Sequence, residues 1–148
     1  MIEKITFDQI LPIWRDYLWP DRTSEITATS AMCYLGGYDL ENMYFDPSFF
    51  AYIIDGEIAG VNSGHMCLAQ HYRSRGLYVF EKFRGKGIAV ELLKATIEQG
   101  RIENAVMSWS YPRQSSWKSY AAAGFSLASD WDASETSDSN AYCRIDLC

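Results

Sequence analysis

The sequence predicts a mixed α/β (α+β) fold in which a mostly antiparallel sheet is flanked by helices. Two short apolar runs separated by an Asp-Gly pair are typical of a β-hairpin. A third apolar run leads through a glycine-rich turn into a stretch with helical apolar spacing. The chain has 148 residues, 48% of them apolar, and no repeat or low-complexity linker divides it. Residues 1–148 are therefore expected to form one domain.

The first 18 residues are expected to form a short strand and then a helix. Thr6 and Gln9 have the spacing of a capping box, and Asp8 is the alternative cap. Proline is tolerated only in the first turn of a helix. Because of Pro12, the regular part of this helix is expected to start near Leu11.

A second helix is expected from Arg22 to Leu35, where a Gly-Gly pair follows. Two strands are then predicted at Phe49–Ile54 and Ile58–Leu68, joined by a hairpin turn at Asp55-Gly56. The next elements are expected to be a strand at Arg73–Phe80, a helix at Gly87–Gln99 ended by Gly100, and a strand at Ala105–Trp109. A helix at Ser115–Ala123, ended by Gly124, is expected to follow. The last two strands are expected at Phe125–Ser129 and Ala141–Leu147, with the polar loop Asp130–Asn140 between them.

The stretch from Val79 to Ala89 is the most informative part of the chain. It joins a strand, a tight turn with two glycines and the start of a helix, where free N–H groups and the helix dipole favour an anion. Lys82, Arg84 and Lys86 add positive charge to a protein whose net charge is −6. This local reversal of sign predicts an anion-binding loop.

Two common phosphate-binding motifs do not fit this loop. A P-loop needs Ser or Thr after its lysine, whereas Lys86 is followed by Gly87. The dinucleotide fingerprint needs a third small residue where this chain has Val90.

The loop instead resembles the acetyl-CoA signature of the GNAT family of N-acetyltransferases, R/Q-x-x-G-x-G/A. Arg84, Gly87 and Ala89 stand at its three positions, and Val79 stands where the family's strand carries a valine. The resemblance covers the chain from about Phe49 onward and implies that acetyl-CoA is the cofactor, with its pyrophosphate held by the loop amides. The cofactor-binding residues that it implies are Leu77, Tyr78, Val79, Arg84, Gly85, Lys86, Gly87, Ile88 and Ala89.

A second motif, from Tyr120 to Phe125, is similar to the family's Y-x-x-x-G-F segment. The resemblance places Tyr120 near the sulfur of CoA, where it would give a proton to the thiolate leaving group; packing beside Phe125 is the alternative role. The family often has Asn seven residues before this tyrosine. Here that residue is Arg113, which either binds the pantetheine arm or a phosphate, or faces solvent.

The other catalytic groups are less defined. By resemblance, backbone N–H groups at a bulge around Leu77–Val79 stabilise the oxyanion. His65 is the candidate general base because it titrates in the right range and lies on the neighbouring strand. Glu81 and a water chain are the alternatives. Arg73 and Arg75 either end their strand in solvent or contact the substrate or the 3′-phosphate of CoA.

The resemblance implies an acetyl-CoA-dependent N-acetyltransferase that acts on a primary amine of a small molecule or peptide. The alternatives are a CoA-binding sensor without turnover and a transferase of another acyl group. The net charge of −6 argues against nucleic-acid and anionic-membrane partners and is compatible with a cationic substrate. Five aromatic residues either cage such a cation or belong to the core: Trp14, Tyr17, Trp19, Tyr34 and Tyr38.

The remaining expectations come from composition. The four cysteines contain no C-x-x-C pair and no zinc-ligand spacing with the histidines, so no metal site is expected and free thiols in the cytoplasm are favoured. No apolar run approaches the ~20 residues that cross a bilayer. The aromatic content, 15% of the chain, is compatible with a homodimer, because apolar patches mark interfaces.

Overall fold

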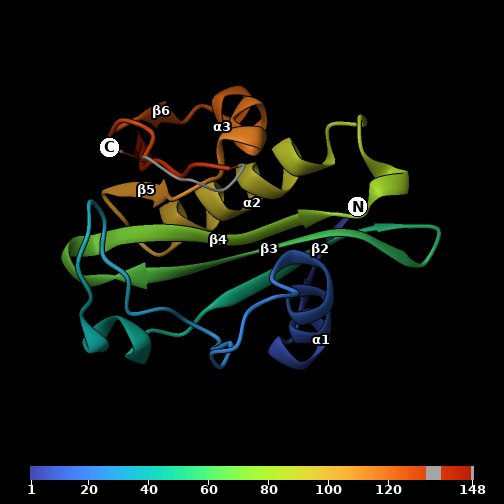
Figure 1. The fold of residues 1–148 in the computed structure, drawn as a ribbon, viewed down its shortest axis with the longest axis horizontal. Helices are drawn as coiled ribbons and strands as arrows, with labels where there is room; N and C mark the ends of the chain where they lie inside the picture. The colour runs from blue at the N-terminus through green and yellow to red at the C-terminus, as the bar shows by residue number, and fades with distance from the viewer. Residues whose placement is uncertain (133–137, 148) are drawn as a thin grey trace.

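A computed structural model describes residues 1–132 and 138–147 of the chain. Seven strands form one sheet in the order β1-β2-β3-β4-β5-β7-β6, and helices lie against both of its faces (Figure 1). The elements are β1 (Ile2–Ile5), α1 (Phe7–Ile13), β2 (Ser48–Ile54), β3 (Glu57–Cys67), β4 (His71–Val79), α2 (Ile88–Ile102), β5 (Met107–Ser110), α3 (Trp117–Ala123), β6 (Ser126–Leu127) and β7 (Cys143–Asp146). Every paired strand is antiparallel to its neighbour except β4 and β5, which are parallel. The predicted fold class is confirmed.

The sheet is buried on both faces because α1 and α2 cover opposite sides of it (Figure 1). Successive side chains of a strand point to opposite faces. Phe49 and Ala51 of β2 therefore pack in the cluster that contains α1, while Phe50 packs in the cluster that contains α2. This explains why β2 is an almost continuous apolar run in the sequence.

The first helix differs from the prediction in its start. The capping box is present, with Gln9 N donating to Thr6 Oγ1 at 3.2 Å and Thr6 N donating to Gln9 Oε1 at 2.9 Å. The helix therefore begins at Phe7, and the expected start near Leu11 is wrong. Pro12 lies inside the helix and has no N–H for a bond to the preceding turn. The chain then widens into a π-helical turn at Trp14–Leu18.

The predicted helix from Arg22 to Leu35 is wrong, because this segment is irregular. Short hydroxylated side chains bond to the local backbone and so compete with helix formation; Thr27 Oγ1 donates to Thr29 O at 2.5 Å. The segment is tied to the sheet by the buried side chain of Asn42, which donates to Ala31 O at 3.2 Å and accepts from the N–H of Leu68 at 2.9 Å.

The later elements follow the prediction with shifted ends. Asp55 and Gly56 form the hairpin turn with φ values of +51° and +77°. Gly100 does not end α2 as expected, because it lies inside the helix, where a Cβ would stand 3.2 Å from the ring of Tyr72. Gly124 ends α3 with φ of +112°. Residues 133–137 of the predicted polar loop lie outside the described residues.

The two parallel strands separate along their length. β4 and β5 pair only from His71 to Arg73, opposite Met107 to Trp109. Beyond this point β4 continues to Val79, whereas β5 ends at Ser110. The last hydrogen bond between the two strands comes from a side chain, because Ser110 Oγ donates to Ser74 O at 2.7 Å. The open edge of β4 after Ser74 is thus free to line a cleft.

A bulge bends β4 at the same place. Ser63 of β3 pairs with Arg75 and Val61 pairs with Tyr78, so that Gly76 and Leu77 together oppose one residue. Glycine is required here, because Gly76 has φ of +83° and a Cβ would stand 2.4 Å from the ring of Trp14. Trp14 also holds the bulge by donating from Nε1 to Gly76 O at 2.8 Å. A bulge was predicted around Leu77–Val79, and it lies one residue earlier.

Candidate active site

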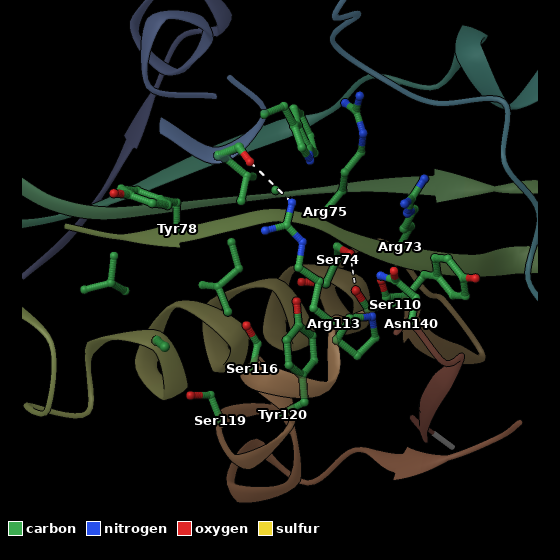
Figure 2. A pocket seen from close by; sticks show the side chains of 18 of the residues that line it. Arg73, Ser74, Arg75, Tyr78, Ser110, Arg113, Ser116, Ser119, Tyr120 and Asn140 are labelled. Carbon is green, nitrogen blue, oxygen red and sulfur yellow. Dashed lines mark hydrogen bonds between the residues drawn. The ribbon is translucent and has the colours of Figure 1, made fainter. Parts of the chain in front are cut away.

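A cleft of about 1120 Å³ opens where β4 and β5 separate (Figure 2). One wall comes from β4, the glycine loop and the start of α2, and another from the segment between β5 and α3. The third wall comes from the π-helical turn and the irregular segment that follows it. The segment that was wrongly expected to be a helix is therefore part of the site.

No helix in the described ranges 1–132 and 138–147 is both long and apolar enough to cross a membrane.

The glycine loop presents unused donors to this cleft. Gly85 and Gly87 have φ values of +81° and +78°, which turn the chain sharply before α2. Among the described residues, the N–H groups of Gly85, Lys86 and Gly87 have no hydrogen-bond acceptor, and the first amides of α2 have no partner within the helix. A Cβ at either glycine would meet no atom within 4 Å. The loop thus combines free donors with open space, and this fits a bound diphosphate.

Only one of the three basic side chains in this loop faces the cleft. Arg84 lines it, donates from Nε to Val79 O at 2.9 Å and lies 5.6 Å from the centroid of the Tyr78 ring. Lys82 is instead paired with Glu57 at 2.8 Å. The predicted cofactor residues that line the cleft are Leu77, Tyr78, Val79, Arg84, Gly85, Gly87, Ile88 and Ala89. Lys86 is the exception, since it does not line the cleft; its Nζ lies 5.7 Å from the ring centroid of Phe83.

Tyr120 extends from α3 into the cleft (Figure 2). Its ring packs against Phe125 with centroids 5.6 Å apart, because Gly124 ends the helix and turns Phe125 back onto it. Burial raises the pKa of Tyr120 above its ordinary value, and the neighbouring Ser110 hydroxyl offsets only part of this effect. Tyr120 therefore keeps its proton at neutral pH, and its packing role and a proton-donor role are compatible.

The structure does not bring His65 to the cleft. Its side chain is fully buried in β3 and is absent from the cleft lining. Burial, followed by the charge of Arg73, lowers the pKa of His65 to about 3. Nδ1 lies 3.1 Å from Met66 O, and Nε2 has no partner among the described residues. A neutral imidazole enclosed in this way gives no support to the predicted role as general base. Glu81, the alternative, is exposed and also lies outside the lining.

The aromatic residues do not form an empty cage. Trp14 is fully buried in the core, and the guanidinium of Arg75 lies 5.0 Å from its ring and 5.3 Å from that of Trp19. The faces of Trp14 and Trp19 are therefore already covered by a protein cation, whereas Tyr17 and Tyr38 are exposed and line the cleft. Arg75 itself is only 5% exposed, which excludes the solvated strand end that the sequence left open.

Arg113 connects the two sides of the cleft. Its Nη2 donates to Leu18 O at 3.4 Å, so a residue that precedes α3 contacts the N-terminal part of the chain across the opening (Figure 2). This contact could not be predicted from the sequence, because the two residues are 95 positions apart.

A sequence model of the acetyltransferase (GNAT) family matches residues 11–125. No curated protein matches the chain. Among the solved structures that are similar over nearly the whole of both chains are the following three. An IAA acetyltransferase from Bacillus cereus ATCC 14579 has a TM-score of 0.69 and 15% identity and covers 99% of each chain. An acetyltransferase of Staphylococcus aureus Mu50 has a TM-score of 0.66 and 15% identity, covering 100% of this chain and 99% of the other. A Bacillus subtilis acetyltransferase in complex with CoA has a TM-score of 0.68 and 17% identity, covering 99% of this chain and 98% of the other. At these identities the likeness shows the fold.

Proposed function

Since this chain belongs to the GNAT family of acetyltransferases, we propose that it transfers an acetyl group from acetyl-CoA, the family's cofactor, to the primary amine of a small molecule or peptide. The observation that carries the proposal is that one cleft holds the glycine loop, the bulged strand β4 and Tyr120 together. The loop supplies donors for a diphosphate, and the cleft extends from there past the bulge to Tyr120.

The chain's own residues have three tasks in this proposal. The free amides from Gly85 to Ala89 bind the diphosphate, and the open edge of β4 orients the pantetheine arm. Backbone N–H groups at the bulge of Gly76 and Leu77 are proposed to stabilise the oxygen that gains negative charge. When acetyl-CoA is bound, its thioester supplies the acetyl group, and the amine displaces the thiolate. Tyr120 Oη keeps its proton at neutral pH and is the proton donor.

The amine has to lose a proton without a conventional base. Among the described residues, neither a histidine nor a carboxylate lines the cleft. We therefore propose that the amine binds in its neutral form or gives its proton to water. Because a free lysine-type amine has a pKa of about 10.4, kcat/KM for such an acceptor should rise with pH and show no inflection near pH 6 to 7.

The direct test incubates the protein with acetyl-CoA and a panel of amines. Release of the free thiol is measured, and the acetylated product is identified by mass spectrometry. Removal of a proton donor should lower kcat, so Tyr120→Phe is expected to reduce it by about 100-fold while the Kd for CoA stays unchanged. Tyr72→Phe is the matched control, because Tyr72 is equally buried, its hydroxyl has no partner among the described residues and it does not line the cleft. An unchanged kcat in Tyr120→Phe would exclude the donor role.

One second candidate is a CoA-binding sensor without turnover, because no histidine or carboxylate of the described residues lines the cleft. Calorimetry separates it from the enzyme. CoA binding without thiol release from any amine would support the sensor, whereas turnover of a single amine would eliminate it.

A further inference from the structure

The cleft is strongly cationic in a protein whose net charge is −6. Within the described part of the chain, every charged side chain of its lining is an arginine, and no carboxylate faces it: Arg22, Arg73, Arg75, Arg84 and Arg113. A diphosphate at the glycine loop accounts for Arg84. It does not account for Arg73 and Arg75, which lie on the other side of the β4 bulge from the glycine loop.

Arg73 and Arg75 lie beyond the bulge from the glycine loop, because they precede Gly76 in β4 while the loop follows Val79. Ser74 faces α2, since its hydroxyl accepts from Thr96 Oγ1 at 3.1 Å. Side chains alternate along a strand. Arg73 and Arg75 therefore share the opposite face of β4, toward the irregular N-terminal segment (Figure 2).

Arg75 is held firmly in this position. Its Nη1 donates to Thr27 O at 2.9 Å, and the rings of Trp14 and Trp19 lie on its guanidinium. No carboxylate in the described chain pairs with it. Burial, and then the charges of Arg73 and Arg22, lower the pKa of Arg75 to about 9, so it is still protonated at neutral pH. A buried charge without a counter-ion is costly, and a ligand anion would compensate it.

Arg73 is the second unpaired cation. Its side chain has no hydrogen bond or ion pair with any residue that the structure describes, and its buried Nε is without a partner. Its guanidinium lies 5.1 Å from the ring of Trp109. Arg73 and Tyr120 line the same cleft (Figure 2).

We propose that the acceptor is an anionic amine, in which a carboxylate or phosphate group binds Arg73 and Arg75 and so presents its amine beside Tyr120. The planar fork of a guanidinium matches both anions. This inference rests on the proposed acetyltransferase function and names the substrate class of that site. It reverses the expectation from net charge, which is compatible with a cationic acceptor.

Paired substrates test the proposal directly. Amino acids are compared with the amines that lack their carboxylate, such as phenylalanine with phenethylamine, and phosphoethanolamine is compared with ethanolamine. Each rate is normalised to the concentration of the neutral form of the amine, so that differences in amine pKa do not affect the comparison. Because hydrogen bonds between charged groups are strong, the anionic member of at least one pair should have a kcat/KM about 10- to 100-fold higher. The pair that shows the preference identifies carboxylate or phosphate as the recognised group.

Variants show whether Arg73 carries the preference. Arg73→Gln should raise the KM for the anionic amine about 10-fold or more and leave the KM for acetyl-CoA unchanged, and Arg73→Lys should recover part of the loss. Arg101→Gln is the matched control, because Arg101 lies exposed on α2 beside Glu98 and outside the cleft. A rise in the KM for acetyl-CoA instead would assign Arg73 to the cofactor and overturn the proposal.

A binding measurement keeps this proposal separate from the acetyltransferase function. Inorganic phosphate is titrated into the CoA-loaded wild type and the Arg73→Gln variant. Saturable binding that the variant weakens about 10-fold supports the anion site even when no amine is turned over. Equal turnover of the charged and uncharged member in both substrate pairs, together with no phosphate binding, overturns the inference while the acetyltransferase function stands.

Discussion

Replacing Gly87 by Ala tests whether the glycine loop binds the diphosphate. Gly87 has φ of +78°, and an added Cβ would meet no atom within 4 Å. Any effect on folding must therefore come from the backbone conformation alone. Gly56, in the hairpin between β2 and β3, has φ of +77° and the same open space, but it does not line the cleft. The two positions are matched in φ and in free space, and only Gly87 lines the cleft.

The expected magnitudes follow from these values. A left-handed conformation costs an alanine about 1–2 kcal/mol, and the smaller entropy of the unfolded chain offsets about 0.4–1 kcal/mol of this. Each variant should lose about 1 kcal/mol in its free energy of unfolding, which a domain of this size tolerates. At Gly87 the new methyl group also occupies the space in front of the free amides. Loss of one hydrogen bond to a charged phosphate costs about 1.5–3 kcal/mol, so the Kd for CoA should rise about 10- to 100-fold.

Two measurements check this prediction. Urea unfolding gives the free energy of unfolding of each variant, and calorimetry gives the Kd for CoA at a temperature where both variants are folded. Equal losses of stability with a rise of Kd in Gly87→Ala alone would support the loop as the diphosphate site. A Kd in Gly87→Ala within twofold of the wild-type value, or the same rise in both variants, would refute it.

Two further predictions concern buried residues of β3. In the folded protein the pKa of His65 is about 3, which is lower than its usual value of about 6.5. Between these two pH values the unfolded chain therefore binds one proton that the folded chain does not bind. The stability contributed by neutral His65 is fully present above pH 6.5 and falls as the pH decreases toward 3. Between pH 7 and 5 the wild type should therefore lose about 2 kcal/mol more than His65→Gln in urea unfolding, and parallel pH slopes would contradict this. Gly64→Ala should destabilise the fold by about 1–3 kcal/mol, because its Cβ would lie within 2.7 Å of three atoms of the Tyr72 ring and hydroxyl. Gly60→Ala, whose nearest contact is 3.0 Å, should cost less in the same unfolding measurement, and the reverse order would show that packing is not the cause.

Features that depend on near neighbours could be predicted from the sequence. The capping box of Thr6 and Gln9 works across three residues, and the Asp55-Gly56 turn needs only residues that tolerate positive φ. The glycine loop is also local: its turn and its free amides result from residues 84–89 themselves.

Features that depend on distant contacts could not be predicted in this way. The segment from Arg22 to Leu35 resembles a helix in composition, but the buried side chain of Asn42 and local hydroxyl bonds hold it as an irregular wall of the cleft. His65 has the residue type of a general base, but its position in β3 removes it from solvent and from the cleft. Alternation along a strand does not reveal which face the final packing encloses.

The sequence by itself determined the mixed fold class, the glycine loop with its free amides and the turn that brings Phe125 back onto Tyr120, since each of these follows from the conformational preferences of adjacent residues. Only the tertiary structure decided the chemistry at the other end of the cleft. There β4 and β5 separate, the N-terminal segment folds over β4, and Arg73 and Arg75 are left without acidic partners among the described residues. The physical reason is that desolvation and charge pairing depend on every group that packs nearby, and these groups come from parts of the chain far apart in sequence.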